Sequence, residues 1–287
     1  MSEKEIDSVT NVETTGHEWD GIKELNNPLP RWWVWVFYAT IVFAIGYSIY
    51  YPAIPLIEGA TKGVGGYSSR LELQQTMAEV EAGRADLLEE IRTTDVTEIQ
   101  DNPELARFAS AGGASAFKVY CSQCHGSGAQ GAAGYPNLND DDWLWGGSVD
   151  QIAYTIRHGV RYDEDMDTRY SEMPAFGEIL PREEVLAVAH YVRSLSGLDH
   201  DGTAMETGTR VYMENCSACH GDNGLGNTDL GAPNLADALW LYGSSHQELV
   251  SQINNPKHGA MPAWGERLGD ALVKQLAVYV HGLGGGE

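Results

Sequence analysis

The sequence predicts an all-α protein with one membrane-spanning helix near the N-terminus and two tandem copies of a small helical domain. An uncharged run of 20 residues, from Trp32 to Tyr51, is long enough to cross a hydrocarbon core as a helix. Beyond Gly113 the chain repeats itself, and the apolar spacing within each copy leaves only short loops as candidate strands. The predicted parts are a tail (1–30), an anchor (31–57), a linker with an amphipathic helix (58–105), and the two copies (106–198 and 204–287).

The first two parts are a polar tail and an anchor. Residues 1–30 show no periodic apolar face, so we expect a flexible tail. Aromatic residues crowd both ends of the uncharged run, as they do at membrane interfaces: Trp32, Trp33, Trp35, Tyr47, Tyr50 and Tyr51. The leader is long and acidic, which argues against a cleaved signal peptide. Lysines and arginines are balanced on the two sides, so charge leaves the orientation open.

The third part begins with a glycine-rich linker and continues as a helix. Residues 58–67 contain four glycines. Apolar residues then recur mostly every three or four positions, at Leu73, Met77, Val80, Leu87, Leu88 and Ile91. Because the opposite face is acidic, we expect this stripe to pack on this protein or a neighbouring subunit rather than on lipid.

The repeat is visible in three aligned blocks. Gly113 and Cys121 precede Gly208 and Cys216 by 95 residues, and PNLNDDDWLWGGS from Pro136 matches PNLADALWLYGSS 97 residues later. MPAFGE matches MPAWGE 88 residues later, and similar helical sequences close both copies. Each copy is therefore the same domain, of about 90 and about 80 residues.

The four cysteines lie in two Cys-x-x-Cys-His motifs, one in each copy. They are Cys121, Cys124 and His125, and Cys216, Cys219 and His220. On a helical turn, the two thiols can add to the vinyl groups of a porphyrin while the next residue faces the iron, which is the signature of covalent heme c. A zinc site would need four converging ligands, and a thioredoxin-like pair would need an adjacent βαβ unit. We therefore expect two heme c groups, with His125 and His220 as axial ligands.

A methionine in each copy is the candidate for the other axial position. Met173 and Met261 are each followed by proline and lie at equivalent points of the two copies. Met166 competes in the first copy but has no counterpart in the second. Two histidines near these loops, His158 and His258, are weaker rivals. A thioether ligand closes the coordination sphere and raises the reduction potential, as in electron-carrying cytochromes.

Several other residues are expected to support the hemes. A ligating imidazole usually donates its second N–H to an acceptor, and we expect the carbonyl of Pro136 to serve His125 and that of Pro233 to serve His220. Trp143 and Trp240 recur in phase, either as donors to heme propionates or as packing residues. The glycines at 113 and 208 would let the first helix of a domain approach the last one closely, with Phe117 or Tyr212 stacking near Tyr191 or Tyr279.

The charge and the remaining motifs limit the functional classes. A formal charge of −23 argues against nucleic acid as a partner, whereas a basic protein partner remains compatible. No nucleotide-binding glycine loop or set of catalytic side chains is present. The heme motifs are compatible with an electron-transfer subunit, a free-standing tethered electron carrier, or a diheme peroxidase with one open iron; two equivalent Met-Pro loops argue against the peroxidase.

With the acidic tail, the run NNPLPRWWVWVFYATIVFAIGYSIYYPAIP, the stretch NPELARFASAGG and two Cys-x-x-Cys-His-Gly domains, nearly the whole chain resembles the CcoP/FixP family. These are the diheme subunits (subunit III) of cbb3-type cytochrome c oxidases. The resemblance implies two class I cytochrome c domains that are not themselves catalytic. It implies electron transfer from a donor cytochrome c or a bc complex, through the monoheme subunit, toward the heme b and copper subunit.

The resemblance also implies a location and leaves one assignment open. Heme c is attached outside the bacterial inner membrane, so the domains would be periplasmic and the tail cytoplasmic, with a single span in the lipid bilayer. A methionine of one copy can serve the heme of the other in this family. Which iron Met173 and Met261 bind is therefore open.

Overall fold

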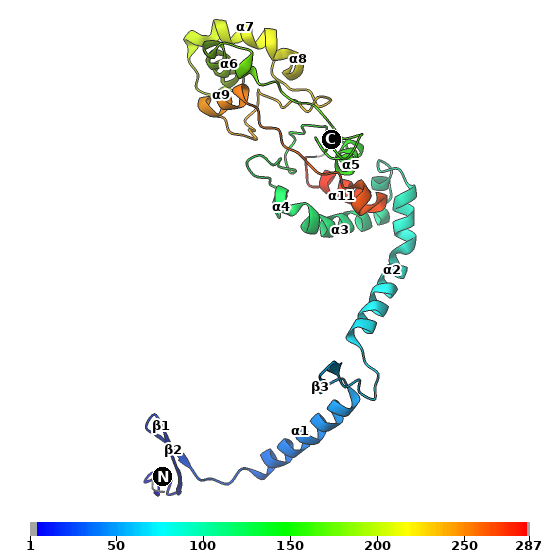
Figure 1. Cartoon of the computed structure of the whole chain (residues 1–287), viewed down its shortest axis with the longest axis vertical. Coiled ribbons are helices and arrows are strands. Elements are labelled where there is room, and N and C mark those ends of the chain that lie inside the picture. The colour runs from blue at the N-terminus through cyan, green and yellow to red at the C-terminus, as the bar shows by residue number, and fades with distance from the viewer. Residues whose placement is uncertain (1–4, 286–287) are drawn as a thin grey trace. The chain divides into compact units, whose positions relative to one another are not determined.

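The computed structural model describes residues 5–285 and divides into two compact units, with the boundary between Ala82 and Gly83 (Figure 1). The first unit contains a two-stranded hairpin, β1 (Thr14–Trp19) and β2 (Ile22–Leu25), and the helix α1 (Arg31–Tyr50). A second, very short antiparallel pair follows, formed by β3 (Pro55–Leu56) and β4 (Gly59–Ala60). The predominantly helical fold predicted from the sequence is confirmed.

A hairpin lies within the segment that the sequence predicted to be a flexible tail. Strands β1 and β2 pair antiparallel, with Trp19 opposite Ile22. Asp20 and Gly21 between them have φ angles of 49° and 84°. Two successive positive φ values match the right-handed twist of a hairpin, and Asp-Gly is a preferred pair for such a turn. The signal was present in the sequence, but it lies in a polar segment without a periodic apolar face.

Helix α1 coincides with the predicted anchor. It begins after Pro30, which caps its N-terminus, and none of its residues is buried. Within the described part of the chain it is the one helix that is long and apolar enough to cross a membrane. Its 20 residues span about 30 Å at 1.5 Å per residue, which matches the hydrocarbon core of a bilayer.

The second unit begins within α2 (Ser69–Thr93) and contains the repeated part of the chain. Its longer helices are α3 (Pro103–Tyr120), α5 (Val149–His158), α6 (Arg182–Leu195), α7 (Met205–Asn215), α9 (His246–Asn254) and α11 (Asp270–His281). The one-turn helices are α4 (Ser122–His125), α8 (Ser217–His220) and α10 (Gly265–Leu268). Short 3-10 turns lie at η1 (Ile99–Asp101), η2 (Phe176–Glu178) and η3 (Gly202–Ala204).

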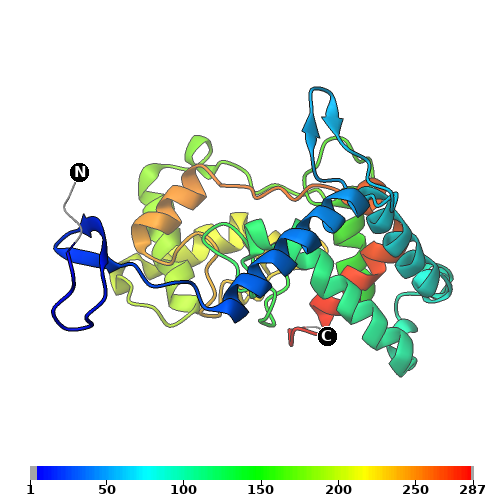
Figure 2. The same ribbon diagram turned by 90° about the horizontal axis from the view of Figure 1, so that it is seen from below.

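The helices pack into two lobes, and each lobe combines the two sequence repeats. In lobe A, the last helix of the second repeat, α11, packs against α3 and α5 of the first (Figures 1 and 2). In lobe B, the last helix of the first repeat, α6, packs against α7 and α9 of the second. Residues 106–198 and 204–287 are thus the two sequence copies, whereas each hydrophobic core takes its closing helix from the other copy.

The connection lengths explain this exchange. Helix α6 ends at Leu195 and α7 begins at Met205, so only a short segment joins them. Helices joined by a short connection pack as antiparallel neighbours, which holds α6 on α7 and leaves α11 for α3. The connections from α5 to α6 and from α9 to α11 are longer and pass each other, as shown by the backbone bonds between Val160 and Met261.

Glycine allows the crossing helices of each lobe to approach closely, as the sequence predicted. A side chain at Gly113 would overlap the carbonyl of Gln275 on α11, and one at Gly208 would overlap the carbonyl of Ala187 on α6. The aromatic pairs that accompany these crossings are Phe117 with Tyr279, at 5.6 Å between ring centroids, and Tyr212 with Tyr191, at 5.0 Å.

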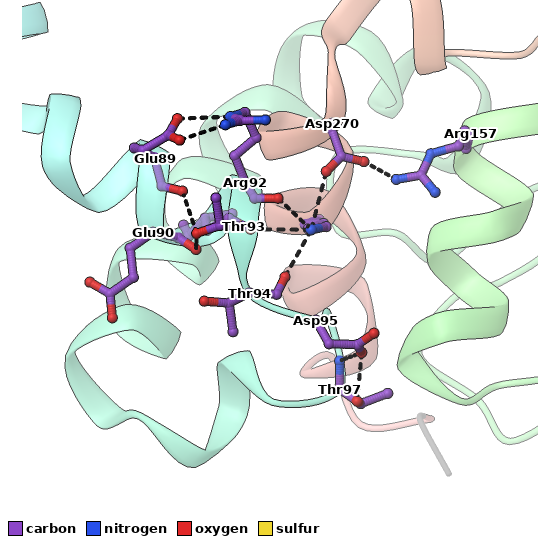
Figure 3. Close-up of polar contacts among 11 residues, drawn as sticks. Glu89, Glu90, Arg92, Thr93, Thr94, Asp95, Thr97, Arg157 and Asp270 are labelled. Atoms are coloured by element: carbon purple, nitrogen blue, oxygen red, sulfur yellow. Dashed lines mark hydrogen bonds and ion pairs between the residues drawn. The ribbon is translucent and has the colours of Figure 1, made fainter.

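Helix α2 ends on lobe A through a lysine of α11. Lys274 Nζ donates to the carbonyl oxygens of Ile91, Arg92 and Thr94 at 3.3, 2.9 and 2.8 Å. These carbonyls are in or just after the last turn of α2, where a cation also interacts favourably with the helix dipole. Asp270 forms an ion pair with Lys274, at 3.1 Å. The same carboxylate forms a second ion pair with Arg157 of α5 (Figure 3).

Only the C-terminal part of the predicted apolar stripe on α2 packs within this chain. Ile91 is fully buried and Leu87 packs beside it in the core of lobe A. Leu73, Met77 and Val80 are exposed. The expectation that the stripe packs on this protein therefore holds for its last two turns.

Candidate heme sites

Each Cys-x-x-Cys-His motif forms one helical turn. The N–H of His125 donates to the carbonyl of Cys121 at 3.0 Å in α4, and the N–H of His220 donates to that of Cys216 at 3.0 Å in α8. Each motif is joined to the preceding helix by a bond from its first cysteine, so the turn is held firmly on lobe A or lobe B. The first cysteine and the histidine of each motif therefore lie one helical turn apart, as the heme c motif requires.

The four cysteines differ in exposure. All four are free thiols; Cys121 and Cys216 are half-buried against the two cores, whereas Cys124 and Cys219 are exposed. Burial, followed by the neighbouring cysteine, raises the pKa of Cys121 and that of Cys216 to about 11. Both sulfurs are neutral at physiological pH, and conversion to a neutral thioether places no new charge in the core.

Both histidines are oriented by the carbonyl that the sequence predicted. His125 Nδ1 donates to Pro136 O at 3.0 Å, and His220 Nδ1 donates to Pro233 O at 3.1 Å. The proton on Nδ1 leaves Nε2 free to bind a metal. Burial lowers the pKa of both imidazoles, an effect that the bond to the carbonyl partly offsets, so the neutral form required for ligation is favoured.

The methionine loops lie in the lobes that the exchanged helices define. Met261, in the second repeat, packs against the core of lobe A together with Cys121 of the first repeat. Met173, in the first repeat, packs against the core of lobe B together with Cys216 of the second. The competitor Met166 is 98% exposed and contacts neither core.

His158 and His258, the rival candidates for the axial position, each lie beside a carboxylate. His158 Nδ1 lies 3.1 Å from the carboxylate of Asp165, and this imidazole with Asp165 and Asp167 forms a small cluster of potential metal ligands. His258 Nδ1 lies 3.8 Å from Glu172. His258 Nε2 is buried without a partner among residues 5–285, whereas Met173 and Met261 each pack against a core beside a cysteine.

The two tryptophans that recur at equivalent points of the repeats have different surroundings. Trp143 packs on the core of lobe A and its Nε1 donates to Gly285 O. Trp240 packs on the core of lobe B, and its buried Nε1 has no partner among residues 5–285. A buried donor without an acceptor is costly. This orphaned N–H fits a cofactor that brings its own acceptor, such as the propionate of a heme, so the residues present fit the predicted group.

The backbone contact beside Met261 was not anticipated from the sequence. Val160 and Met261 exchange two backbone hydrogen bonds of 2.9 Å, and the adjacent residue Arg161 bonds through its N–H to Arg169 O at 2.8 Å. The sequence did contain one sign of this contact. The offset between the repeats falls from 97 at the proline block to 88 at the methionine, so the first repeat has nine additional residues before its methionine.

Two comparisons with known families match the parts of this architecture. Residues 11–58 match the N-terminal domain of cytochrome oxidase-cbb3, FixP. Residues 109–192 and 203–280 each match cytochrome c oxidase, cbb3-type, subunit III. The second match covers both Cys-x-x-Cys-His motifs and both Met-Pro loops.

Full-length relatives agree with these matches. The cbb3-type cytochrome c oxidase subunit FixPc of Rhizobium leguminosarum bv. viciae is 56% identical over 100% of both chains. Subunit FixP of Sinorhizobium medicae is 57% identical over 99% of this chain and 98% of the relative. Subunit CcoP of Cereibacter sphaeroides is 49% identical over 96% and 95%.

Proposed function

The chain belongs to the FixP/CcoP family of cbb3-type cytochrome c oxidase subunits, and from this premise we propose how its two lobes carry electrons in the oxidase. Each lobe holds one covalently attached heme c. Cys121 and Cys124 hold the heme of lobe A, and Cys216 and Cys219 hold that of lobe B.

The axial ligands of each heme come from different repeats. His125 and Met261 ligate the iron in lobe A, and His220 and Met173 ligate that in lobe B. The observation that carries this assignment is the packing of each methionine in the same core as the first cysteine of the other repeat. The proposal thus follows the exchanged helices, not the order of the residues along the chain.

These residues suit electron transfer rather than catalysis at the iron. A heme c supplies an iron that alternates between Fe(III) and Fe(II). The imidazole, fixed by its bond to the proline carbonyl, would bind the iron through Nε2, and the methionine thioether would supply the second protein ligand, which raises the reduction potential. Two protein ligands would leave no open position for dioxygen, which would be reduced in another subunit. Gly134 N donates to Leu241 O at 2.9 Å between the lobes, a contact that supports a fixed arrangement of one lobe against the other.

The partners and the orientation follow from the same premise. The donor is a cytochrome c or a bc complex, and the electron passes by way of the monoheme subunit to the subunit with heme b and copper. Helix α1 anchors the chain in the inner membrane, with the tail in the cytoplasm and both lobes in the periplasm, because heme c is attached outside that membrane. The charge of −23 favours a basic donor, and this attraction weakens as salt rises.

Affinity purification of the full chain tests the assignment to the oxidase. The chain, tagged at its C-terminus, is isolated from membranes in mild detergent, and its reduced spectrum and oxygen consumption are measured. We expect b-type bands beside the c-type bands, two c-type hemes per chain, and cyanide-sensitive oxidation of reduced cytochrome c. Two c-type hemes without b-type bands or oxidase activity would instead support a free-standing tethered electron carrier.

A further inference from the structure

The side chain of Arg161 bonds to both methionine loops. Its Nε donates to Gly259 O at 2.7 Å, and its Nη1 donates to Ser171 O at 2.7 Å. Gly259 lies two residues before Met261, and Ser171 lies two residues before Met173. One guanidinium therefore joins equivalent carbonyls of two loops that belong to different lobes.

This contact breaks the symmetry of the repeats. Arg161 lies in the segment that makes the first repeat nine residues longer between its proline block and its methionine. The second repeat reaches its methionine directly after α9 and has no residue in the corresponding place. A single side chain from the longer loop thus holds the two equivalent loops.

The backbone holds Arg161 in place for this contact. Its φ angle is 49°, in the left-handed region that residues other than glycine rarely adopt. Backbone bonds hold the N-terminal side of this residue, from Arg161 N to Arg169 O and between Val160 and Met261, and on its C-terminal side Tyr162 N donates to Thr168 Oγ1 at 3.1 Å. A strained conformation persists where the surrounding structure determines it, and such positions are common at functional sites.

The guanidinium donates to carbonyls and not to a carboxylate. Within residues 5–285 Arg161 forms no ion pair, although Glu172 is close enough to act on its charge. The side chain is half-buried at this position. Its two fixed donors are therefore used on backbone carbonyls, and the planar fork of arginine suits two acceptors in different directions.

We infer that Arg161 is a positioning residue that holds the loops of Met173 and Met261 together, so that one side chain stabilises both iron–sulfur bonds. The inference rests on the proposed assignment of these methionines as ligands. Loss of the bridge frees each loop to swing its sulfur away from the iron. Arg161 itself contacts the loops and not the iron.

The test measures how fast imidazole replaces the methionines in the ferric, two-heme protein purified as the full chain in detergent. The variants are Arg161→Met, which removes all donors, and Arg161→Lys, which keeps the charge without the fork. Arg193→Gln is the matched control, because it removes another half-buried guanidinium that donates to two backbone carbonyls, those of Asp199 and Ser244, neither of which lies in a methionine loop. The sulfur-to-iron charge-transfer band is recorded alongside the rate.

We expect both Arg161 variants to bind imidazole about tenfold faster than the unmodified protein. The spectral change from both hemes, and not from one alone, should occur at the faster rate. A hydrogen bond from a charged donor is of the size that changes a rate or equilibrium by that factor. Arg193→Gln should stay within twofold. If Arg161→Met left the imidazole rates unchanged, or if only one of the two hemes reacted faster, the inference that Arg161 holds both loops would be wrong. If Arg161→Met does not assemble with heme, the rate of Arg161→Lys decides in the same way.

The same measurement separates this inference from the ligand assignment on which it rests. A charge-transfer band that is absent from the unmodified protein would refute methionine ligation itself. A band that is present there, with imidazole rates unchanged by Arg161→Lys and Arg161→Met, would refute only the role of Arg161.

Discussion

Truncation of Leu276 tests the exchange of helices between the repeats. Leu276 is fully buried in α11, a helix of the second repeat, and it packs in lobe A with Phe117 of the first repeat. Replacement of such a leucine by alanine removes its transfer free energy and leaves a cavity, at a cost of about 2–5 kcal/mol. With about 1–3 kcal/mol per molar urea for a small domain, we expect the unfolding midpoint of lobe A to fall by roughly 1–2 M.

The assay reports each lobe separately. In a Cys216→Ala/Cys219→Ala background only the heme attached at Cys121 and Cys124 remains, and in a Cys121→Ala/Cys124→Ala background only the heme attached at Cys216 and Cys219 does. Urea titration of the sulfur-to-iron charge-transfer band of the remaining heme in the ferric protein should show that Leu276→Ala, in the second repeat, lowers the midpoint when the heme of the first repeat is kept and leaves it unchanged when the heme of the second repeat is kept.

A matched variant exists in the other repeat. Val188 is the counterpart of Leu276, 88 residues earlier, and it is fully buried in lobe B. Val188→Ala should have the opposite pattern, lowering the midpoint when the heme at Cys216 and Cys219 is kept, by a smaller amount because fewer carbons are lost. If Leu276→Ala instead destabilised the heme attached at Cys216 and Cys219 of its own repeat, the exchange inferred from the packing would be refuted.

Three further predictions concern the ligands, the end of α2 and a raised carboxyl pKa. Met173→His or Met261→His should each lower one of two midpoint potentials in a redox titration, since axial ligands can move potentials over about 0.8 V; an unchanged titration removes that methionine from the ligands. Lys274→Met removes three hydrogen bonds to carbonyls and should destabilise the end of α2 by about 2 kcal/mol. Amide hydrogen exchange in residues 87–94 should become faster, and unchanged exchange would contradict this capping role. Burial, with the nearby charge of Asp237, raises the pKa of the half-buried Asp142 to about 6, so its contribution to stability is complete below about pH 4 and is lost as pH rises through 6. After allowance for solvent screening, Asp142→Asn should be more stable than the unmodified protein by about 1 kcal/mol at pH 8 and should show no gain at pH 4 in urea unfolding; an equal difference at both pH values contradicts the shift.

Much of the candidate site follows from short-range pattern alone. The Cys-x-x-Cys-His spacing is satisfied by one helical turn, so α4 and α8 could be placed without knowledge of the rest of the fold. The carbonyls of Pro136 and Pro233 were predictable as acceptors because the loop after each motif returns to its histidine. The close approach at Gly113 was equally visible, although its partner helix was not.

The sequence was a poorer guide where polar segments fold or where loops cross. The hairpin at residues 14–25 depends on a two-residue turn and has little core, so the absence of apolar periodicity concealed it. The role of Arg161 could not be predicted from the sequence, because its two acceptors lie ten and 98 residues away along the chain.

The sequence by itself determined the helical class, the apolar N-terminal helix, the repeat and the two Cys-x-x-Cys-His motifs proposed to bind heme. These features depend on spacing within a turn or on the composition of one helix, which a local segment carries in full. Only the tertiary structure decided which helix closes which core and which methionine lies with which cysteine pair. The two copies are so alike that α6 and α11 offer nearly equivalent apolar faces to α3 and α7. The short connection between α6 and α7 selects among the pairings, and that selection acts only when the chain packs.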